Sequence, residues 1–208
     1  QVATLARGGQ GAGSSGMLAG SRRGLGVLAS MRLPRVPLRD FRSRLASSAV
    51  ASVKSYNVAG VGTGARSTVE CRGHTVLTDV PRAMGGGDSA PQPVELLLAA
   101  LIGCETATAT FVANKMRPRL RLERISFEYT AERDQRGALA SPIDVAPVVP
   151  AHLTRIVGTA KVVAARGEDV SQARLALLKE QVEARCPVAS MVRASGCEMD
   201  VRWVAANE

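Results

Sequence analysis

The 208-residue chain is long enough for one domain and a tail, and 46% of its residues are hydrophobic but only 3% aromatic, so its core would rest on aliphatic side chains. The net charge of +9 gathers at one end: residues 1–50 hold eight Arg and one acid, whereas residues 51–208 hold 19 basic and 17 acidic side chains. This distribution argues against a wide phosphate-binding surface, and we expect no nucleic-acid partner.

Residues 1–45 have the composition of a targeting segment. They are rich in Arg, Ser, Gly and Ala, are almost free of acids, and lack the long apolar run of a secretory signal. We therefore expect a transit peptide that directs the protein to the mitochondrion, with the plastid as the second choice. The alternative is a disordered basic tail on a cytoplasmic protein. A single domain would then occupy residues 50–206.

Two segments after this tail alternate apolar and polar side chains with the period of half-buried strands. They span residues 50–59 and 66–80, and the Gly-rich stretch between them predicts a turn. The Gly and Pro residues of "MGGGDSAPQP", residues 84–93, predict a loop.

A long helix is predicted from Leu96 to Met116, with Pro93 in its first turn, where a missing N–H does no harm. Its apolar side chains occupy every face, which is typical of a helix buried on all sides. We expect it either in the middle of the fold or covered by a second subunit. Because it carries Glu95 and Glu105, a soluble buried helix fits better than a bilayer span, and no membrane partner is expected.

The remaining segments alternate between strand and helix patterns. The predicted elements are a strand over 119–133, a loop over 134–150, a strand over 152–164, a helix from Asp169 or Ser171 to about Arg185, a short helix over 187–195 and a closing strand over 196–206. Strands, a helix, strands, helices and a final strand in this order predict an α+β fold.

Cys186 directly precedes Pro187, which favours a place at the N-cap of the short helix. There the sulfur would face free backbone N–H groups, which lower a thiol pKa from about 8.5 toward roughly 3.5–7.5. The alternative is a small buried hydrophobic residue. Cys104, on the long helix, is the candidate partner, although by itself it would be core packing. Glu105, in the same apolar stretch, needs a partner or a role.

The stretch "GHTVLTDVP…GGGDSAPQPVELLLAALIGCETATAT", followed later by "EARCPVASMV", resembles the OsmC/Ohr family of thiol-dependent peroxidases over residues 53–204. The resemblance implies two antiparallel sheets wrapped around long central helices in a swapped homodimer, with active sites at the subunit interface. It agrees with a helix that is apolar on all sides.

The resemblance also implies a reaction, in which Cys104 attacks an organic hydroperoxide or hydrogen peroxide and becomes a sulfenic acid. Cys186 then forms a disulfide with Cys104, and a dithiol reductant restores both thiols. No cofactor is needed for this chemistry. The role implied is defence against oxidative stress.

One departure from the family pattern concerns the group that stabilises the thiolate. The best-characterised peroxidases of the family have Glu directly after the second proline of the motif, where this chain has Val94. In this respect the chain resembles the divergent OsmC-like branch of the family. Glu95 would lie on the opposite helix face from Cys104, about 13.5 Å away along the axis. Candidate stabilising residues are Arg66, Arg72, Glu95 and Glu105. The alternative function is a non-catalytic dimer that binds a small hydrophobic ligand or a partner.

Other motifs carry weaker signals. Cys71 and His74 have the spacing of half a zinc site, but no second compact pair exists, so we expect no metal. The "GVGTGA" stretch matches a loose dinucleotide pattern, but the alternation after it favours a strand where that site needs a helix. Four cysteines without C-x-x-C spacing do not indicate a disulfide scaffold, and Cys71 and Cys197 are expected to be bystanders on strands.

Overall fold

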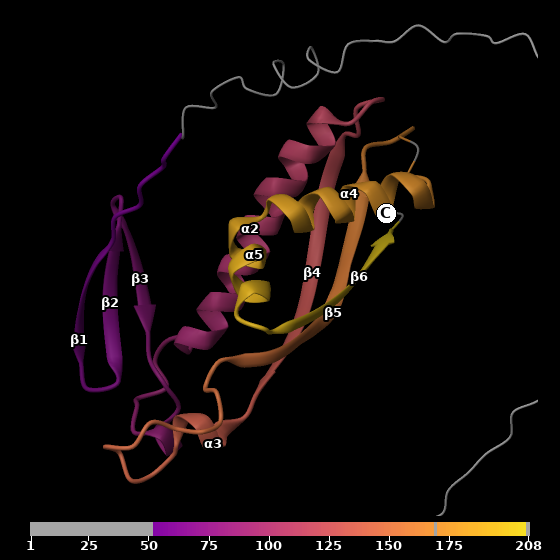
Figure 1. Cartoon of the computed structure of the whole chain (residues 1–208). Coiled ribbons are helices and arrows are strands. Elements are labelled where there is room, and N and C mark those ends of the chain that lie inside the picture. Colours follow the sequence, from indigo (N-terminus) through magenta and orange to yellow (C-terminus); the bar gives the residue numbers. More distant parts are fainter. Residues whose placement is uncertain (1–51, 169, 207–208) are drawn as a thin grey trace, which may run out of the picture. The chain divides into compact units, whose positions relative to one another are not determined.

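The structure is a computed structural model that describes residues 52–168 and 170–206 (Figure 1). The predicted transit segment, residues 1–45, lies outside the described residues. The elements are β1 (Ala59–Thr63), β2 (Arg66–Cys71), β3 (His74–Thr78), a 3₁₀ turn η1 (Arg82–Met84), α2 (Pro93–Lys115), β4 (Leu122–Arg133), α3 (Gln135–Ala138), β5 (Leu153–Ala164), α4 (Gln172–Arg185), α5 (Pro187–Ala194) and β6 (Glu198–Ala205). All belong to one unit, which begins at Ser55.

The first sheet is an antiparallel meander in the order β1-β2-β3. Its strands begin and end at other residues than the sequence predicts. Residues 52–58 have no regular structure, the glycine-rich segment expected to turn is β1 itself, and the predicted long strand is divided between β2 and β3. The division falls at Arg72 and Gly73, whose φ angles of 51° and 84° form the turn.

The glycines of β1 are compatible with a strand because of a close approach to β2. A Cβ on Gly60 would come within 3.0 Å of the Val69 side chain across the pair. The first sheet also lacks a core of its own within the described chain: every side chain of β1 is exposed, and none in β2 or β3 is fully buried.

The loop between β3 and α2 is organised by Asp79, which is only 1% exposed. Its carboxylate accepts hydrogen bonds from the backbone N–H groups of Val80, Gly87 and Ser89 and from the Ser89 hydroxyl, at 2.7–3.2 Å. Gly86 is required here, because a Cβ would lie 2.0 Å from the Val80 carbonyl oxygen. The buried carboxylate thus fixes the segment that leads into α2.

The second sheet has the order β4-β5-β6. β4 and β5 pair antiparallel, as expected for neighbouring strands, but β6 runs parallel to β5. The expectation of two purely antiparallel sheets is therefore wrong for this sheet. The helices α4 and α5 form the crossover that returns the chain in the same direction.

The helices cover one face of the second sheet and enclose the larger core (Figure 1). Apolar side chains from both layers interlock there, and the buried ones are Ala109, Val112, Ala113, Met116, Leu120, Ala160, Val162, Leu175, Leu178, Val182, Val201 and Trp203. The three predicted strands at 119–133, 152–164 and 196–206 and the three predicted helices therefore all exist, with shifts of a few residues at their ends.

Helix α2 is not buried on all sides within one chain. Leu101, Ala109 and Val112 face the core, but Leu97 is 41% and Phe111 56% exposed. A place in the middle of the single-chain fold is thus wrong, and coverage by a second subunit stays a prediction. By length and composition alone α2 could also cross a bilayer, and only 28% of its most apolar window is buried.

Candidate functional site

Cys186 occupies the junction between α4 and α5. It is the N-cap of α5, with Pro187 in the first helical position, as the sequence predicts. Its sulfur accepts a hydrogen bond from the Ala189 N–H at 3.4 Å. The residue is completely buried, so the local Cys-Pro signal and the packing of two helices together fix its position.

Cys104 reaches this sulfur from the middle of α2. Its side chain packs against the apolar cluster that contains Cys186, and its interaction with that thiol raises the pKa of Cys186. Both cysteines belong to the smaller apolar cluster, where Cys104 is half-buried; its fully buried members are Leu101, Leu153, Ile156, Cys186, Ala189, Val192 and Cys197. The packing of α2 on α5 therefore brings together two thiols that are 82 positions apart in the sequence.

Burial raises the pKa of the Cys186 thiol to about 11. The interaction with Cys104 also raises this pKa, and the Ala189 N–H lowers it less than burial raises it. The sequence-based expectation of a lowered Cys186 pKa is therefore wrong. The N-cap donor is present as expected, but desolvation has the larger effect.

Glu105 adjoins this pair as a buried carboxylate on α2, only 1% exposed. The Tyr129 hydroxyl, on β4, donates a hydrogen bond to its Oε2 atom. Burial raises the pKa of Glu105, while Tyr129 and the positive charge of Arg193 act in the opposite direction and Glu183 raises it further. The charge of Glu105 in turn raises the pKa of Cys186, an effect opposite in sign to the predicted thiolate stabilisation.

Arg193 and Tyr129 are members of this site that the sequence analysis missed. The Nη2 atom of Arg193 lies 3.3 Å from the Glu183 carboxylate, and its Nη1 donates to the Glu183 carbonyl at 3.2 Å, which ties α5 to α4. A signal for Arg193 was its place on the short helix, two turns after Cys186. Tyr129 carried no signal beyond its position in an alternating strand.

The other predicted stabilising residues lie elsewhere. Glu95 caps α2, because its Oε2 accepts the Gln92 N–H at 2.8 Å, and it is exposed. Arg66 begins β2, and Arg72 follows that strand in the turn. Both are exposed, and neither guanidinium forms a hydrogen bond or ion pair with another residue in the described part of the chain. One chain thus does not bring these three residues to the thiols.

An apolar cavity of about 320 Å³ adjoins the smaller cluster. It is lined by Val94 and Leu97 of α2, by Leu153 and Val192 of the cluster, and by Arg133 at the end of β4, among others. Val94, which replaces the acid of the family motif, is therefore a cavity residue. Arg133 is a cation that the sequence analysis did not select.

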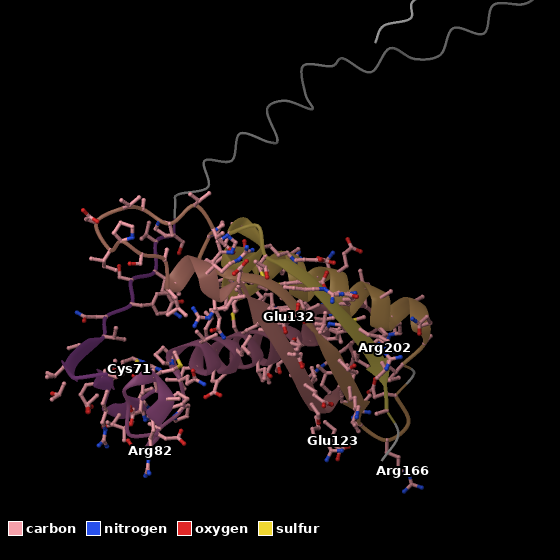
Figure 2. All side chains as sticks on the ribbon, turned by 90° about the horizontal axis from the view of Figure 1, so that it is seen from below. Cys71, Arg82, Glu123, Glu132, Arg166 and Arg202 are labelled. Atoms are coloured by element: carbon pink, nitrogen blue, oxygen red, sulfur yellow. The ribbon has the colours of Figure 1, made fainter. Side chains whose placement is uncertain are left out.

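The remaining cysteines have no evident chemical role. Cys71 ends β2, where it pairs with His74 across the turn; Figure 2 labels it on this sheet. Cys197 lies just before β6 and is buried, and burial raises its pKa. Within residues 52–168 and 170–206 no group of three His, Cys, Asp or Glu side chains could hold a metal ion.

The fold and the paired thiols define an α+β protein of the OsmC/Ohr architecture. The family model described as "OsmC-like protein" matches residues 85–202, and the chain belongs to this family. A search of curated proteins finds no match.

Solved structures of three bacterial proteins share the fold. An OsmC-like protein from Mycoplasma pneumoniae has 18% identity and a TM-score of 0.58, with 74% of this chain and 99% of that chain covered. An OsmC-like protein of unknown function from Vibrio cholerae has 14% identity and a TM-score of 0.59, with 73% and 100% covered. An organic hydroperoxide resistance protein from Legionella pneumophila has 18% identity and a TM-score of 0.53, with 75% and 99% covered. These similarities confirm the predicted fold class.

Proposed function

We propose that this protein is a thiol-dependent peroxidase that reduces organic hydroperoxides or hydrogen peroxide in defence against oxidative stress. The observation that carries the proposal is that Cys104 packs against the smaller apolar cluster, which contains Cys186. The Cys104 thiolate attacks a peroxide oxygen, the O–O bond breaks, and an alcohol or water leaves. Cys186 then converts the Cys104 sulfenic acid to a disulfide, and a dithiol reductant restores the two thiols.

The environments of the two thiols support this division of roles. Cys186 is fully buried and its pKa is raised to about 11, so at neutral pH it stays protonated and reacts poorly with peroxide. Cys104 is half-buried and therefore the more accessible sulfur. A resolving thiol needs no ionisation until the sulfenic acid has formed, which suits Cys186.

A homodimer forms part of the proposal. The exposed apolar side chains of α2 and the first sheet without a core both support a second subunit that covers them. In a swapped dimer of the kind that the resemblance implies, with active sites at the subunit interface, the first sheet of one subunit would lie near the site of the other. Arg66 or Arg72 would then supply the cation that a reactive thiolate needs.

The test is hydroperoxide consumption in the presence of a dithiol reductant. Wild type should turn over repeatedly, and Cys104→Ser should be inactive. Cys186→Ser should consume about one equivalent and stop with Cys104 oxidised, which separates attack from resolution. Equal rates for wild type and Cys104→Ser would remove the enzyme proposal.

A second candidate is a non-catalytic dimer that binds a small hydrophobic ligand. It is favoured by the cavity of about 320 Å³ and by Val94 in that cavity at the position of the family's acid. This candidate predicts that wild type and Cys104→Ser consume hydroperoxide at the same background rate. Hydroperoxide turnover that depends on Cys104 would count against it.

Mitochondrial localisation is proposed from the composition of residues 1–45. Fusion of this segment to a fluorescent protein should direct the reporter to mitochondria. A reporter that reaches plastids or stays in the cytoplasm would support one of the two alternatives.

A further inference from the structure

Disulfide formation in this site requires a proton acceptor. Cys186 is completely buried and protonated, yet it must lose its proton when its sulfur attacks the sulfenic acid. Bulk water has little access to it. A protein group close to both thiols can take up this proton and pass it to the leaving hydroxide.

Glu105 satisfies this requirement by position. It follows Cys104 directly on α2, about 100° further around the helix, and is 1% exposed. Its hydrogen bonds with the described residues engage Oε2 alone, through the Tyr129 hydroxyl, so Oε1 remains available. Tyr129, which donates to Glu105, and Cys104, the neighbour of Glu105, both pack against the apolar cluster that contains Cys186.

The charged and titratable side chains that affect the pKa of Glu105 lie on β4, α4 and α5. Tyr129 from β4 and Arg193 from α5 favour the carboxylate, whereas burial and Glu183 from α4 favour the carboxylic acid. Because these effects oppose one another and burial is the largest, the pKa of Glu105 lies above its ordinary value. A more basic carboxylate is a better acceptor for a thiol proton.

We propose that Glu105 accepts the proton of the Cys186 thiol during disulfide formation and that Tyr129 holds the carboxylate in position for this transfer. The inference rests on the proposed peroxidase function. It gives a role to a buried carboxylate that peroxide attack by Cys104 leaves unused.

The electron pair of the Cys186 sulfur forms the S–S bond while the S–O bond of the Cys104 sulfenic acid breaks. The proton of Cys186 passes to Glu105 and then to the leaving hydroxide, which becomes water. The Cys186 sulfur is oxidised, the sulfenic sulfur of Cys104 is reduced, and the hydroperoxide supplied the oxidising equivalents.

A merely structural role is the competing explanation, because a buried Glu–Tyr hydrogen bond also joins α2 to β4. Glu105→Gln discriminates between them, since it keeps the size of the side chain and an acceptor for the Tyr129 hydroxyl but cannot take a proton at neutral pH. Glu95→Gln is the matched control, because it removes the other carboxylate of α2, which caps the helix and is exposed.

The experiment is a single turnover of the reduced full chain with one equivalent of an organic hydroperoxide and no reductant. Sulfenic acid is trapped with a 1,3-diketone, and disulfide is measured by mass spectrometry over a range of pH. Glu105→Gln should still form sulfenic acid, but it should convert that sulfenic acid to disulfide about 10²-fold more slowly than wild type at neutral pH. It should also lack the rise of that rate with pH that ionisation of Glu105 gives the wild type.

A disulfide rate and pH profile equal to those of wild type would overturn the role of Glu105 and leave the peroxidase proposal intact. A wild type that forms no sulfenic acid would instead overturn the peroxidase proposal. Tyr129→Phe provides a second test should Glu105→Gln fail to fold. It keeps the carboxylate but removes a donor that lowers its pKa, so the rise in disulfide rate should move to higher pH; an unmoved profile contradicts the role of Tyr129.

Discussion

Cys104, on α2, packs against the apolar cluster that contains Cys186, at the start of α5, and their interaction raises the pKa of Cys186. Each sulfur alone has an unremarkable position, one within a helix and one at a helix N-cap. Their contact turns two separate thiols into a pair that can exchange between dithiol and disulfide. The properties of each should therefore depend on the other.

Replacement of Cys104 by Ala should lower the pKa of Cys186 from about 11, because the interaction with Cys104 is one cause of its elevation. Burial, the larger cause, remains, so the pKa should stay above about 8.5. The ultraviolet absorbance of the thiolate, measured against pH in Cys104→Ala and in the double variant Cys104→Ala/Cys186→Ser, checks this. An unchanged or higher Cys186 pKa would contradict the contact.

Ionisation of Glu105 should destabilise the protein. Its folded-state pKa is raised, so the folded chain holds this proton more tightly, and its contribution to stability is present below about 4.5 and lost as pH rises through the folded-state pKa. Glu105→Gln should therefore gain stability relative to wild type as pH increases. Urea unfolding at several pH values measures the difference, and a difference that shrinks with rising pH would contradict the burial argument.

Asp79 should show the reverse dependence. Hydrogen bonds from Ser89, Val80 and Gly87 hold the pKa of Asp79 well below its usual range. Its contribution is present above about 3.9 and is lost as pH falls toward the folded-state pKa. Asp79→Asn should be less stable than wild type at neutral pH, and the difference should narrow in acid. Thermal unfolding against pH checks this, with Asp88→Asn, an exposed acid of the same loop, as control.

The proposed dimer predicts an effect of charge on the exposed face of α2. Phe111→Asp should weaken self-association, because the 56% exposed ring would lie in the covered apolar surface. Sedimentation at several concentrations measures the association. Val148→Asp is the control, since Val148 is 99% exposed on a loop. If Phe111→Asp and Val148→Asp both associate as strongly as wild type, the dimer interface does not include the exposed face of α2.

The helices were predictable because their signals are local. Pro93 followed by an unbroken apolar run indicates α2, and the Cys186-Pro187 pair indicates the start of α5. The bounds of the first sheet were not predictable, because an exposed strand needs no alternation of apolar and polar residues. The glycines of β1 also indicated a turn. Backbone pairing with β2 decided the outcome there.

The site was predictable only in part. The sequence identifies Cys104, Cys186 and an unusual buried carboxylate, because each departs from its local surroundings. It could not identify Tyr129 or Arg193 as partners of Glu105, since these come from other elements that only tertiary packing brings close. The prediction of a lowered Cys186 pKa was wrong for the same reason, because burial depends on the whole fold.

The most direct test of the account is the connectivity of the oxidised protein. The reduced chain is treated with one equivalent of an organic hydroperoxide, and its peptides are analysed by mass spectrometry without reduction. We predict a disulfide between Cys104 and Cys186, with Cys71 and Cys197 still free thiols. Four unreacted thiols, or a disulfide that leaves out either Cys104 or Cys186, would contradict the proposed redox pair.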